Sequence, residues 1–228
     1  MALSPRPNRP LQAIAFDLDG TLASSEDVYL QVGTETLRRR GKTFDDDLRH
    51  AMMGRPAADA LEVMIQWHQL KETAEELLAE SEQIFWEIAA KELRTMPGAT
   101  ELLDWLDGHE LPRGIVTSGH RKYAERILEL LDLADRFAFL ITADDIEQGK
   151  PAPEPYLLAA EQFGVAASEM MVLEDSHVGS QSGVAAGAFT IALPNAHTAG
   201  HAFDGVAFVA ETLADPRIRQ AIAPQSAG

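Results

Sequence analysis

The spacing of apolar residues changes twice along this chain. A short apolar run rich in strand formers covers residues 11–16 and stops at Asp17. From about Glu26 to Arg94 the apolar residues recur at helical spacing, and this stretch contains no convincing strand pattern. After it, short apolar runs alternate with helical segments to the end of the chain. The pattern predicts one strand, then a helical stretch, then repeated strand–helix units.

The repeated units indicate the fold class. Strands are expected at 114–118, 137–143, 170–175, 189–193 and, as a last short strand, 206–209. Strands that alternate with helices favour a parallel sheet covered on both faces. We therefore predict an α/β fold, a doubly wound Rossmann-like parallel sheet with an inserted α-helical domain.

The helical stretch also sets the expected domain boundaries. Residues 11–24 and 95–228 are predicted to form the sheet domain, and residues 25–94 the inserted helical domain. Residues 1–10 contain three prolines and are expected to form a flexible arm.

Composition and charge narrow the classes of partner. The chain has 228 residues, 46% of them hydrophobic, which suits a globular protein with a sizeable core. A net charge of −17 repels nucleic acid and anionic lipid, so neither is expected as a partner. The chain has no cysteine, no apolar run near the roughly 18–20 residues of a membrane span, and no signal-like apolar core in MALSPRPNRP. A cytoplasmic location is therefore expected, and the sequence indicates no oligomeric state.

Acidic and hydroxyl side chains cluster where the predicted strands end. They are Asp17, Asp19 and Thr21 after the first strand, Thr117 and Ser118 after the second, and Glu174 and Asp175 after the strand at 170–175. The carboxyl edge of an open parallel sheet is where ligands bind. Four carboxylates that converge there would repel one another, so a divalent cation is expected among them.

These residue types fit phosphoryl transfer. A carboxylate nucleophile divides one difficult displacement into two easier ones. A cation, a hydroxyl and a lysine such as Lys150, which follows another strand, stabilise charge on the phosphoryl oxygens. A second carboxylate two residues from the nucleophile can protonate the leaving oxygen and later deprotonate water.

Four segments carry a family resemblance. The sequence resembles the haloacid dehalogenase-like superfamily, in the phosphatase and phosphomutase branch with a helical cap after the first strand. The matching segments, in the family's order and spacing, are DLDGTL (17–22), the strand end at Thr117, Gly149-Lys150-Pro151 and LEDSHVG (173–179).

The resemblance implies a role for each matching residue. Asp17 is the expected nucleophile and Asp19 the expected acid and base, while Thr117 and Lys150 hold the phosphoryl group. The expected Mg²⁺ ligands are Asp17, the main-chain carbonyl of Asp19, Glu174 and Asp175. Four further residues are expected to bind substrate, namely Ser118, Gly119, Gly54 and Arg55. The last two lie in the Gly-Arg-Pro loop between two predicted helices of the cap.

Within the family, the residue two positions after the nucleophile separates some activities. Dehalogenases need no acid there and phosphonatases typically carry a small apolar residue, so Asp19 indicates phosphate ester chemistry. Sugar phosphomutases such as beta-phosphoglucomutase are the nearest alternative. Their cap usually supplies a histidine and an arginine where this chain has Tyr29 and Ala57, although Arg55 lies nearby. Both departures favour hydrolysis.

Two other classes of protein use similar residues. An EF-hand calcium loop needs glycine at its sixth position and glutamate at its twelfth, where this chain has Leu22 and Val28. A non-catalytic receiver domain, phosphorylated on aspartate, lacks an inserted domain and the DxDGT spacing. The sequence therefore predicts a magnesium-dependent phosphatase that hydrolyses a small phosphorylated metabolite through an aspartyl-phosphate intermediate.

Overall fold

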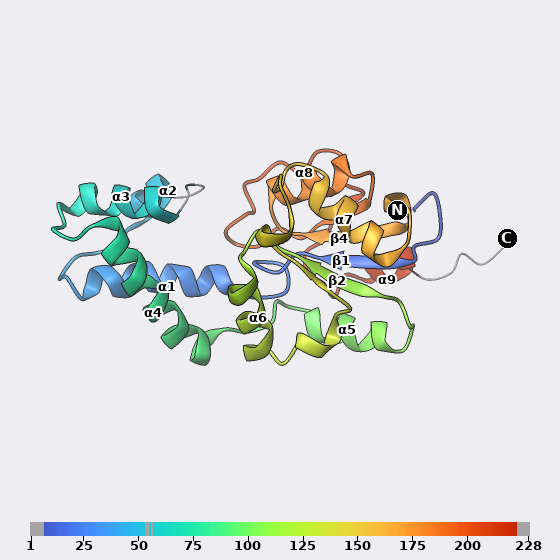
Figure 1. The fold of residues 1–228 in the computed structure, drawn as a ribbon, viewed down its shortest axis with the longest axis horizontal. Coiled ribbons are helices and arrows are strands. Elements are labelled where there is room, and N and C mark those ends of the chain that lie inside the picture. The colour runs from blue at the N-terminus through green and yellow to red at the C-terminus, as the bar shows by residue number, and fades with distance from the viewer. Residues whose placement is uncertain (1–6, 53–54, 56, 223–228) are drawn as a thin grey trace. The chain divides into compact units, whose positions relative to one another are not determined.

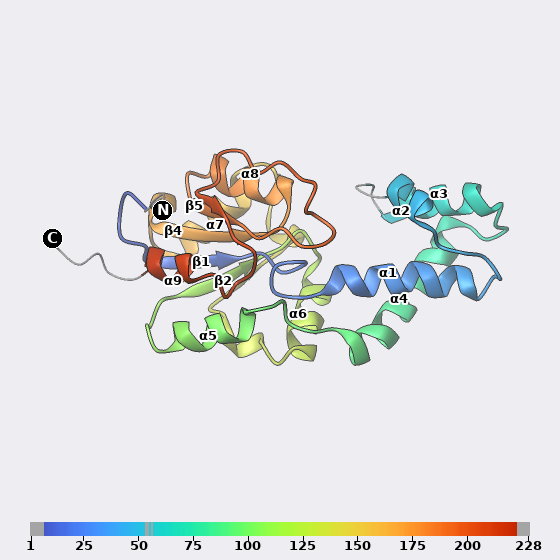
Figure 2. The ribbon, with the colours of Figure 1, turned by 180° about the vertical axis from the view of Figure 1, so that it is seen from behind.

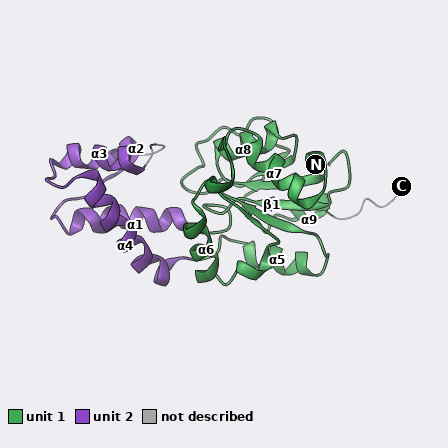
Figure 3. Cartoon of the chain, in the orientation of Figure 1, with its two compact units in different colours: residues 1–24, 94–228 green, residues 25–93 purple. Residues whose placement is uncertain are grey.

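The computed structural model describes residues 7–52, 55 and 57–222, which divide into two compact units. One unit comprises the chain up to Ser24 and from Arg94 onward, and the other comprises Ser25–Leu93 (Figure 3). Gly54 and residues 1–6 of the predicted arm lie outside the described residues.

Within the described residues, the first unit is built on one sheet of six parallel strands in the order β3-β2-β1-β4-β5-β6 (Figure 1). The strands are β1 (Ala13–Phe16), β2 (Arg113–Val116), β3 (Leu140–Ile141), β4 (Met170–Glu174), β5 (Phe189–Ala192) and β6 (Phe208–Val209). The residues of β1, β2 and β4 are buried throughout, as expected for central strands covered on both faces.

Helices cover both faces of this sheet. Figures 1 and 2 show α7 and α8 on one face and α5 and α6 on the other. Arg219 of α9 lies over the ring of Trp105, so α9 packs beside α5. The helices of this unit are α5 (Ala99–Asp107), α6 (Arg121–Leu130), α7 (Glu154–Phe163), α8 (His177–Ala185) and α9 (Pro216–Ile222). The predicted α/β fold with a doubly wound parallel sheet is thus confirmed.

Several strands are shorter than the sequence predicts, and the strand predicted at 137–143 is shortened most. The apolar run at 137–143 forms a strand only at Leu140–Ile141. Thr142 stops it by capping a short 3-10 helix at Ala143–Asp145, whose Asp145 bonds back to the cap. Local capping therefore overrides the apolar pattern.

The strand register brings the functional segments together. Phe16 pairs with Ile115 on one side and with Leu173 on the other, so Asp17, Thr117 and Glu174 all follow at one edge of the sheet. The chain fills positions on one side of β1 through β2 and β3, and then on the other side through β4 to β6. The strand order therefore reverses beside β1, and the loops that follow the two adjacent strands there run in opposite directions. Open α/β sheets bind ligands at such a reversal of strand order.

The second unit is helical in its described residues. Its helices are α1 (Ser25–Arg38), α2 (Asp46–Met52), α3 (Ala57–His68) and α4 (Ala74–Glu92). Their buried faces form a core of Leu37, Leu48, Leu61, Met64 and Leu77. Thr73 and Glu76 form a capping box that fixes the start of α4. That this unit is a cap domain stays a prediction.

Candidate active site

Asp17 and Lys150 form the centre of the candidate site. The Lys150 ammonium donates to Asp17 Oδ1 at 2.6 Å, to Glu174 Oε1 at 2.6 Å and to the carbonyl oxygen of Val116 at 2.9 Å. An ammonium has three N–H donors, so these contacts use all of them. Both Lys150 and Glu174 are almost completely shielded from solvent, with side chains 4% and 0% exposed. Lys150 is therefore a fixed positive charge between two carboxylates.

Glu174 is held from several sides. The phenol of Tyr156, on α7, donates to Oε1 at 2.7 Å, and the hydroxyl of Ser176 donates to Oε2 at 3.2 Å. The first turn of α8 closes over the carboxylate, and a Cβ on Gly179 would lie 2.0 Å from its oxygens. Only glycine fits at this approach, so Gly179 is required by the buried acid.

Burial and charge shift the pKa values of this group. Burial, the Glu174 charge and the Asp19 charge together raise the pKa of Asp17 well above its ordinary value, although Lys150 opposes them. Burial lowers the pKa of Lys150, but Asp17 and Glu174 outweigh it and leave that pKa raised. Burial and then Glu174 raise the pKa of Tyr156, which keeps the phenol as a donor. Asp17 thus lacks enough positive charge around it to ionise as easily as a free aspartate.

Asp175 lies beside Asp17 and is oriented by Asn195. The amide nitrogen of Asn195 donates to Asp175 Oδ2 at 2.9 Å and to the carbonyl oxygen of Gly20 at 3.2 Å. The amide oxygen of Asn195 accepts from the backbone N–H groups of His197 and Thr198, which fixes the orientation of the amide. Gly20 has φ +76°, and a Cβ there would lie 2.5 Å from Asp175 Oδ2.

Asp19 occupies the other side of the site. Tyr123, in the first turn of α6, donates its phenolic hydrogen to Asp19 Oδ1 at 2.7 Å. Thr117 Oγ1 lies 3.4 Å from Asp19 Oδ2 and accepts from the backbone N–H of Gly119 at 3.0 Å. Thr117 and Asp19 therefore face the same space, as the acid and the phosphoryl-binding hydroxyl of one reaction would.

The acidic cluster fits a hard divalent cation. Asp17, Glu174 and Asp175 are all buried, and one carboxylate oxygen from each lies within 4.8 Å of the others. Carboxylate oxygens are the ligands that Mg²⁺ prefers, and one lysine cannot balance three buried acids. Two oxygens of Glu174 already accept hydrogen bonds from Lys150, Tyr156 and Ser176, whereas Asp175 receives the Asn195 amide on Oδ2. The donor set is thus chemically suited to magnesium, with most of the printed hydrogen bonds falling on Glu174.

The structure brings six of the predicted site residues together in the first unit. Asp17, Asp19, Thr117, Lys150, Glu174 and Asp175 share the carboxyl edge of the sheet. Ser118 is exposed beside them, and Gly119 supports Thr117. Arg55 belongs to the second unit, where it is exposed and donates to the carbonyl oxygen of Ala51 at 2.8 Å.

Three residues that contact the predicted site acids were not among the predicted site residues: Tyr123, Tyr156 and Asn195. Both tyrosines lie in the first turn of a helix that follows a site loop, and this position could have indicated them. Asn195 follows β5, so it stands just beyond a strand end like the predicted acids.

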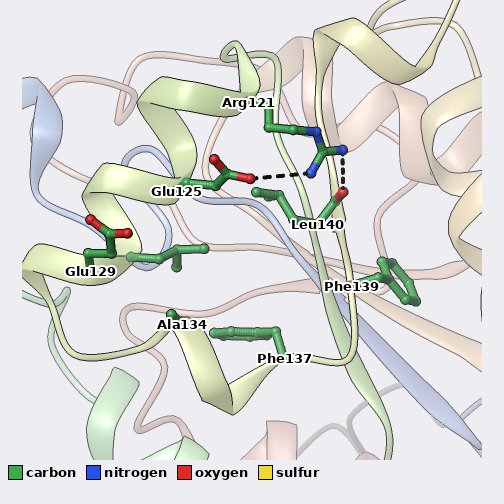
Figure 4. Close-up of a pocket in the computed structure, with 8 residues that line it drawn as sticks. Arg121, Glu125, Glu129, Ala134, Phe137, Phe139 and Leu140 are labelled. Carbon is green, nitrogen blue, oxygen red and sulfur yellow. Dashed lines mark hydrogen bonds and ion pairs between the residues drawn. The ribbon is translucent and has the colours of Figure 1, made fainter.

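A separate hollow lies beside the edge strand β3, between α6 and the Phe137–Leu140 segment (Figure 4). Its basic residue, Arg121, pairs with Glu125 at 3.8 Å and with Asp145 at 2.6 Å, and donates to the carbonyl oxygen of Leu140 at 3.1 Å. The acids neutralise this charge, and none of the predicted site residues lines the hollow. It is therefore not the site of the predicted chemistry.

Comparisons with known proteins agree with this geometry. A model of the family described as haloacid dehalogenase-like hydrolase matches residues 14–193. The chain is 36% identical over 187 residues to validoxylamine A 7'-phosphate phosphatase of Streptomyces hygroscopicus subsp. limoneus, covering 81% of this chain and 86% of that protein. It is 29% identical over 181 residues to the phosphorylated carbohydrates phosphatase of Thermotoga maritima, covering 78% of this chain and 82% of that protein.

A solved structure supports the fold. A Thermotoga maritima protein provisionally assigned as a beta-phosphoglucomutase superposes with a TM-score of 0.86 and 24% sequence identity, over 93% of this chain and 100% of that one. None of the helices in the described part of the chain has the length and apolar character that a membrane crossing requires. The predicted family and the predicted enzyme class, a phosphatase-type hydrolase, are confirmed. Because the family model matches most of the chain and a named relative is 36% identical over most of its own length, the chain belongs to the haloacid dehalogenase-like hydrolase family.

Proposed function

We propose that this protein is a magnesium-dependent phosphatase that hydrolyses a small phosphorylated metabolite through a phosphoryl group carried on Asp17. The observation that carries the proposal is the buried contact of 2.6 Å between Asp17 and Lys150, within a group of three carboxylates. A carboxylate held against a fixed ammonium is suited to attack phosphorus, because the ammonium stabilises the negative charge of the transferring group.

In the first step an Asp17 carboxylate oxygen attacks phosphorus, and the bond from phosphorus to the ester oxygen breaks. The departing oxygen takes a proton from Asp19, so a neutral alcohol leaves and Asp19 becomes a carboxylate. Thr117 donates a hydrogen bond to one phosphoryl oxygen, and Lys150 supplies positive charge to the same group. The product of this step is a mixed anhydride between Asp17 and phosphate.

In the second step water attacks the same phosphorus atom. Asp19, now ionised, accepts the proton of that water, and the bond between phosphorus and Asp17 breaks. Inorganic phosphate leaves, Asp17 regains its carboxylate, and Asp19 regains its proton. The cycle is balanced without an oxidant or a second substrate other than water.

Magnesium would be held by Asp17 and Asp175, with the main-chain carbonyl of Asp19 as an expected third ligand. When bound, it lowers the electrostatic cost of ionising Asp17 and offsets charge on the phosphoryl oxygens. Asn195 then keeps Asp175 pointed at the site, and Gly20 leaves the space that Asp175 occupies. We assign Glu174 to the positioning of Lys150 rather than to direct coordination, since its oxygens already accept three hydrogen bonds.

The relatives support a substrate rich in hydroxyl groups. Two named relatives are phosphatases, one of phosphorylated carbohydrates and one of validoxylamine A 7'-phosphate. We therefore propose phosphorylated carbohydrates and similar small phosphate esters as the substrate class. Hydrolysis is favoured over internal transfer because Tyr29 and Ala57 stand where sugar phosphomutases usually carry histidine and arginine.

A substrate panel tests the proposal. Purified protein with magnesium should release phosphate from sugar and polyol phosphates, and kcat/KM should be compared across the panel. Asp19→Ala should lower kcat/KM for alkyl phosphates by about 10²–10⁴-fold and far less for p-nitrophenyl phosphate, whose leaving group needs little protonation. Interconversion of sugar phosphate isomers without phosphate release would contradict the proposal in favour of a mutase.

A further inference from the structure

Tyr123 is placed to control the residue that moves protons in the proposed reaction. Its ring rises from the first turn of α6 and its hydroxyl reaches Asp19 Oδ1 at 2.7 Å, across 104 residues of sequence. A phenol hydroxyl can donate one hydrogen bond, and here it donates to the carboxylate oxygen. None of the four motif segments of the family resemblance includes this residue.

The Tyr123 ring is itself held in place. A Cβ on Gly119 would lie 3.0 Å from Cδ1 of Tyr123 and 3.4 Å from Thr117 Oγ1. The ring therefore packs over Gly119, next to the phosphoryl-binding hydroxyl, and the absence of a side chain at Gly119 makes room for it. The same glycine donates its N–H to Thr117 Oγ1 at 3.0 Å. Tyr123, Gly119 and Thr117 thus form one packed group whose polar atoms face Asp19.

The two oxygens of Asp19 are placed in different surroundings. Oδ1 accepts the short hydrogen bond from Tyr123, whereas Oδ2 accepts a longer one, of 3.4 Å, from Thr117 Oγ1, the hydroxyl that is proposed to contact the phosphoryl group. We infer that Tyr123 is a positioning residue that fixes the Asp19 carboxyl through Oδ1 and so reserves Oδ2 for proton transfer. This inference rests on the proposed function.

The assignment defines where each proton goes. In the first step the Oδ2 proton passes to the ester oxygen as its bond to phosphorus breaks, and in the second step Oδ2 takes a proton from the attacking water. Tyr123 keeps its own proton in both steps and donates to Oδ1 throughout. Without the phenol, the carboxyl loses the short hydrogen bond that orients Oδ1, and the proton is then delivered from a less favourable geometry.

The chain offers a matched control. Tyr156 also donates a phenolic hydrogen bond of 2.7 Å to a site carboxylate, but its partner is Glu174, which positions Lys150. Tyr123→Phe and Tyr156→Phe each remove one hydroxyl and keep the ring. Loss of the first should affect proton delivery, and loss of the second should affect charge on the phosphoryl group.

The test compares kcat/KM for an alkyl phosphate and for p-nitrophenyl phosphate in wild type and both variants. Because kcat/KM covers only the steps up to the departure of the leaving group, it isolates the first proton transfer. Tyr123→Phe should lower kcat/KM about 10–100-fold for the alkyl ester and less than about threefold for the nitrophenyl ester, the range expected for a hydrogen bond to a charged group. Tyr156→Phe should lower both values by similar factors.

A second readout follows the other half of the reaction. With p-nitrophenyl phosphate, Tyr123→Phe should accumulate more acid-stable phosphoenzyme than wild type, because water attack also needs Asp19 in position. Thermal unfolding of both variants should stay within a few degrees of wild type, which excludes a folding defect.

The outcomes separate the two claims. Equal losses for both esters in Tyr123→Phe, or no loss for either, would overturn the positioning role and leave the phosphatase proposal intact. Absence of turnover in the wild type with both esters and with the substrate panel would overturn the proposed function, and the inference with it.

Discussion

Acidic and basic side chains form networks in both units, but in opposite surroundings. In the helical unit, Arg38, Arg39 and Arg40 pair with Glu35, Glu72 and Glu80 at the surface, a group called here the arginine network. The Arg38 and Arg39 side chains are 70% and 37% exposed. In the sheet unit, Asp17, Lys150 and Glu174 form the buried cluster, in which no side chain is more than 9% exposed.

The pKa values of the acids in the two networks shift in opposite directions. Hydrogen bonds from Arg38 and Arg39 lower the pKa of Glu35 to about 2, so its ionised form is favoured. In the buried cluster, burial and neighbouring acids raise the pKa of Asp17 despite a lysine at 2.6 Å. An ion pair at the surface keeps its hydration, whereas a buried acid in excess loses water and gains repulsion. Perturbed pKa values cluster at functional sites, so the contrast supports the proposal that the buried cluster is the reactive one.

The largest expected effect comes from removing the Asp17 charge. Asp17→Asn keeps the shape of the side chain but cannot form the phosphoryl intermediate, so kcat should fall by at least about 10³-fold. Steady-state assays with the preferred panel substrate measure the loss. Activity within tenfold of wild type would show that another residue attacks phosphorus.

The next largest loss of activity is expected from removing magnesium or one of its proposed ligands. Chelation should inactivate the wild type and added magnesium should restore it. Asp175→Ala should lower kcat/KM at least about 100-fold and raise the magnesium concentration needed for half-maximal rate, because a hard cation loses an anionic ligand. Calorimetry of magnesium binding measures the ligand loss independently of turnover. Full activity in excess chelator would contradict the assignment.

A methyl group added at Gly179 should destabilise the fold by a steric clash with the buried cluster. Alanine normally stabilises a helix relative to glycine by up to about 1 kcal/mol. At Gly179 the added Cβ would lie 2.0 Å from the Glu174 carboxylate, so Gly179→Ala should instead lower the free energy of unfolding by about 1–3 kcal/mol.

Gly200→Ala is the control, since nothing lies within 4 Å of its added Cβ. Chemical denaturation of both variants gives the comparison. Equal stability of the two would mean that the carboxylate does not fill the space above Gly179.

The raised pKa of Asp17 predicts a pH dependence of stability. A group whose pKa is raised on folding contributes stability that is full below its unfolded pKa, about 3.9, and is lost as pH rises through the folded pKa. Metal-free wild type should therefore lose stability above pH 4 relative to Asp17→Asn. Melting temperatures of both proteins, measured in chelator across pH 4–8, test this sign. A wild type that gains stability over Asp17→Asn as pH rises would contradict it.

The arginine network should give the smallest effect. Arg40 is the most buried arginine of the group, with its side chain 15% exposed, and it pairs with Glu72 and Glu80. Arg40→Ala should lower the free energy of unfolding by about 1 kcal/mol or less, with most of the loss removed by high salt. Its kcat should match wild type. A loss of activity comparable to that of Asp175→Ala would remove the distinction between the two networks.

The sequence predicted those parts of the fold and site that depend on strand periodicity. Strands of buried residues were visible as apolar runs, and Asp17, Thr117 and Glu174 stand just where those runs end. Parallel pairing then places such residues at one edge, so their proximity follows from the pattern.

The contacts that complete the site depend on how side chains turn after the strands end. Tyr123 meets Asp19 across 104 residues, and Asn195 meets Asp175 with its amide oriented by two backbone N–H groups. Periodicity carries no information on these rotations. Strand β3 was overestimated for a related reason, since a local cap at Thr142 ended it inside an apolar run.

The central claim is that Asp17 carries the phosphoryl group, and the most direct test is to find it there. Wild-type protein with magnesium and p-nitrophenyl phosphate should be quenched in acid during turnover, digested and analysed by mass spectrometry. We expect one phosphoryl group on the peptide that contains Asp17, absent from Asp17→Asn treated in the same way. A phosphoryl group on another residue, or turnover by Asp17→Asn at the wild-type rate, would contradict the account.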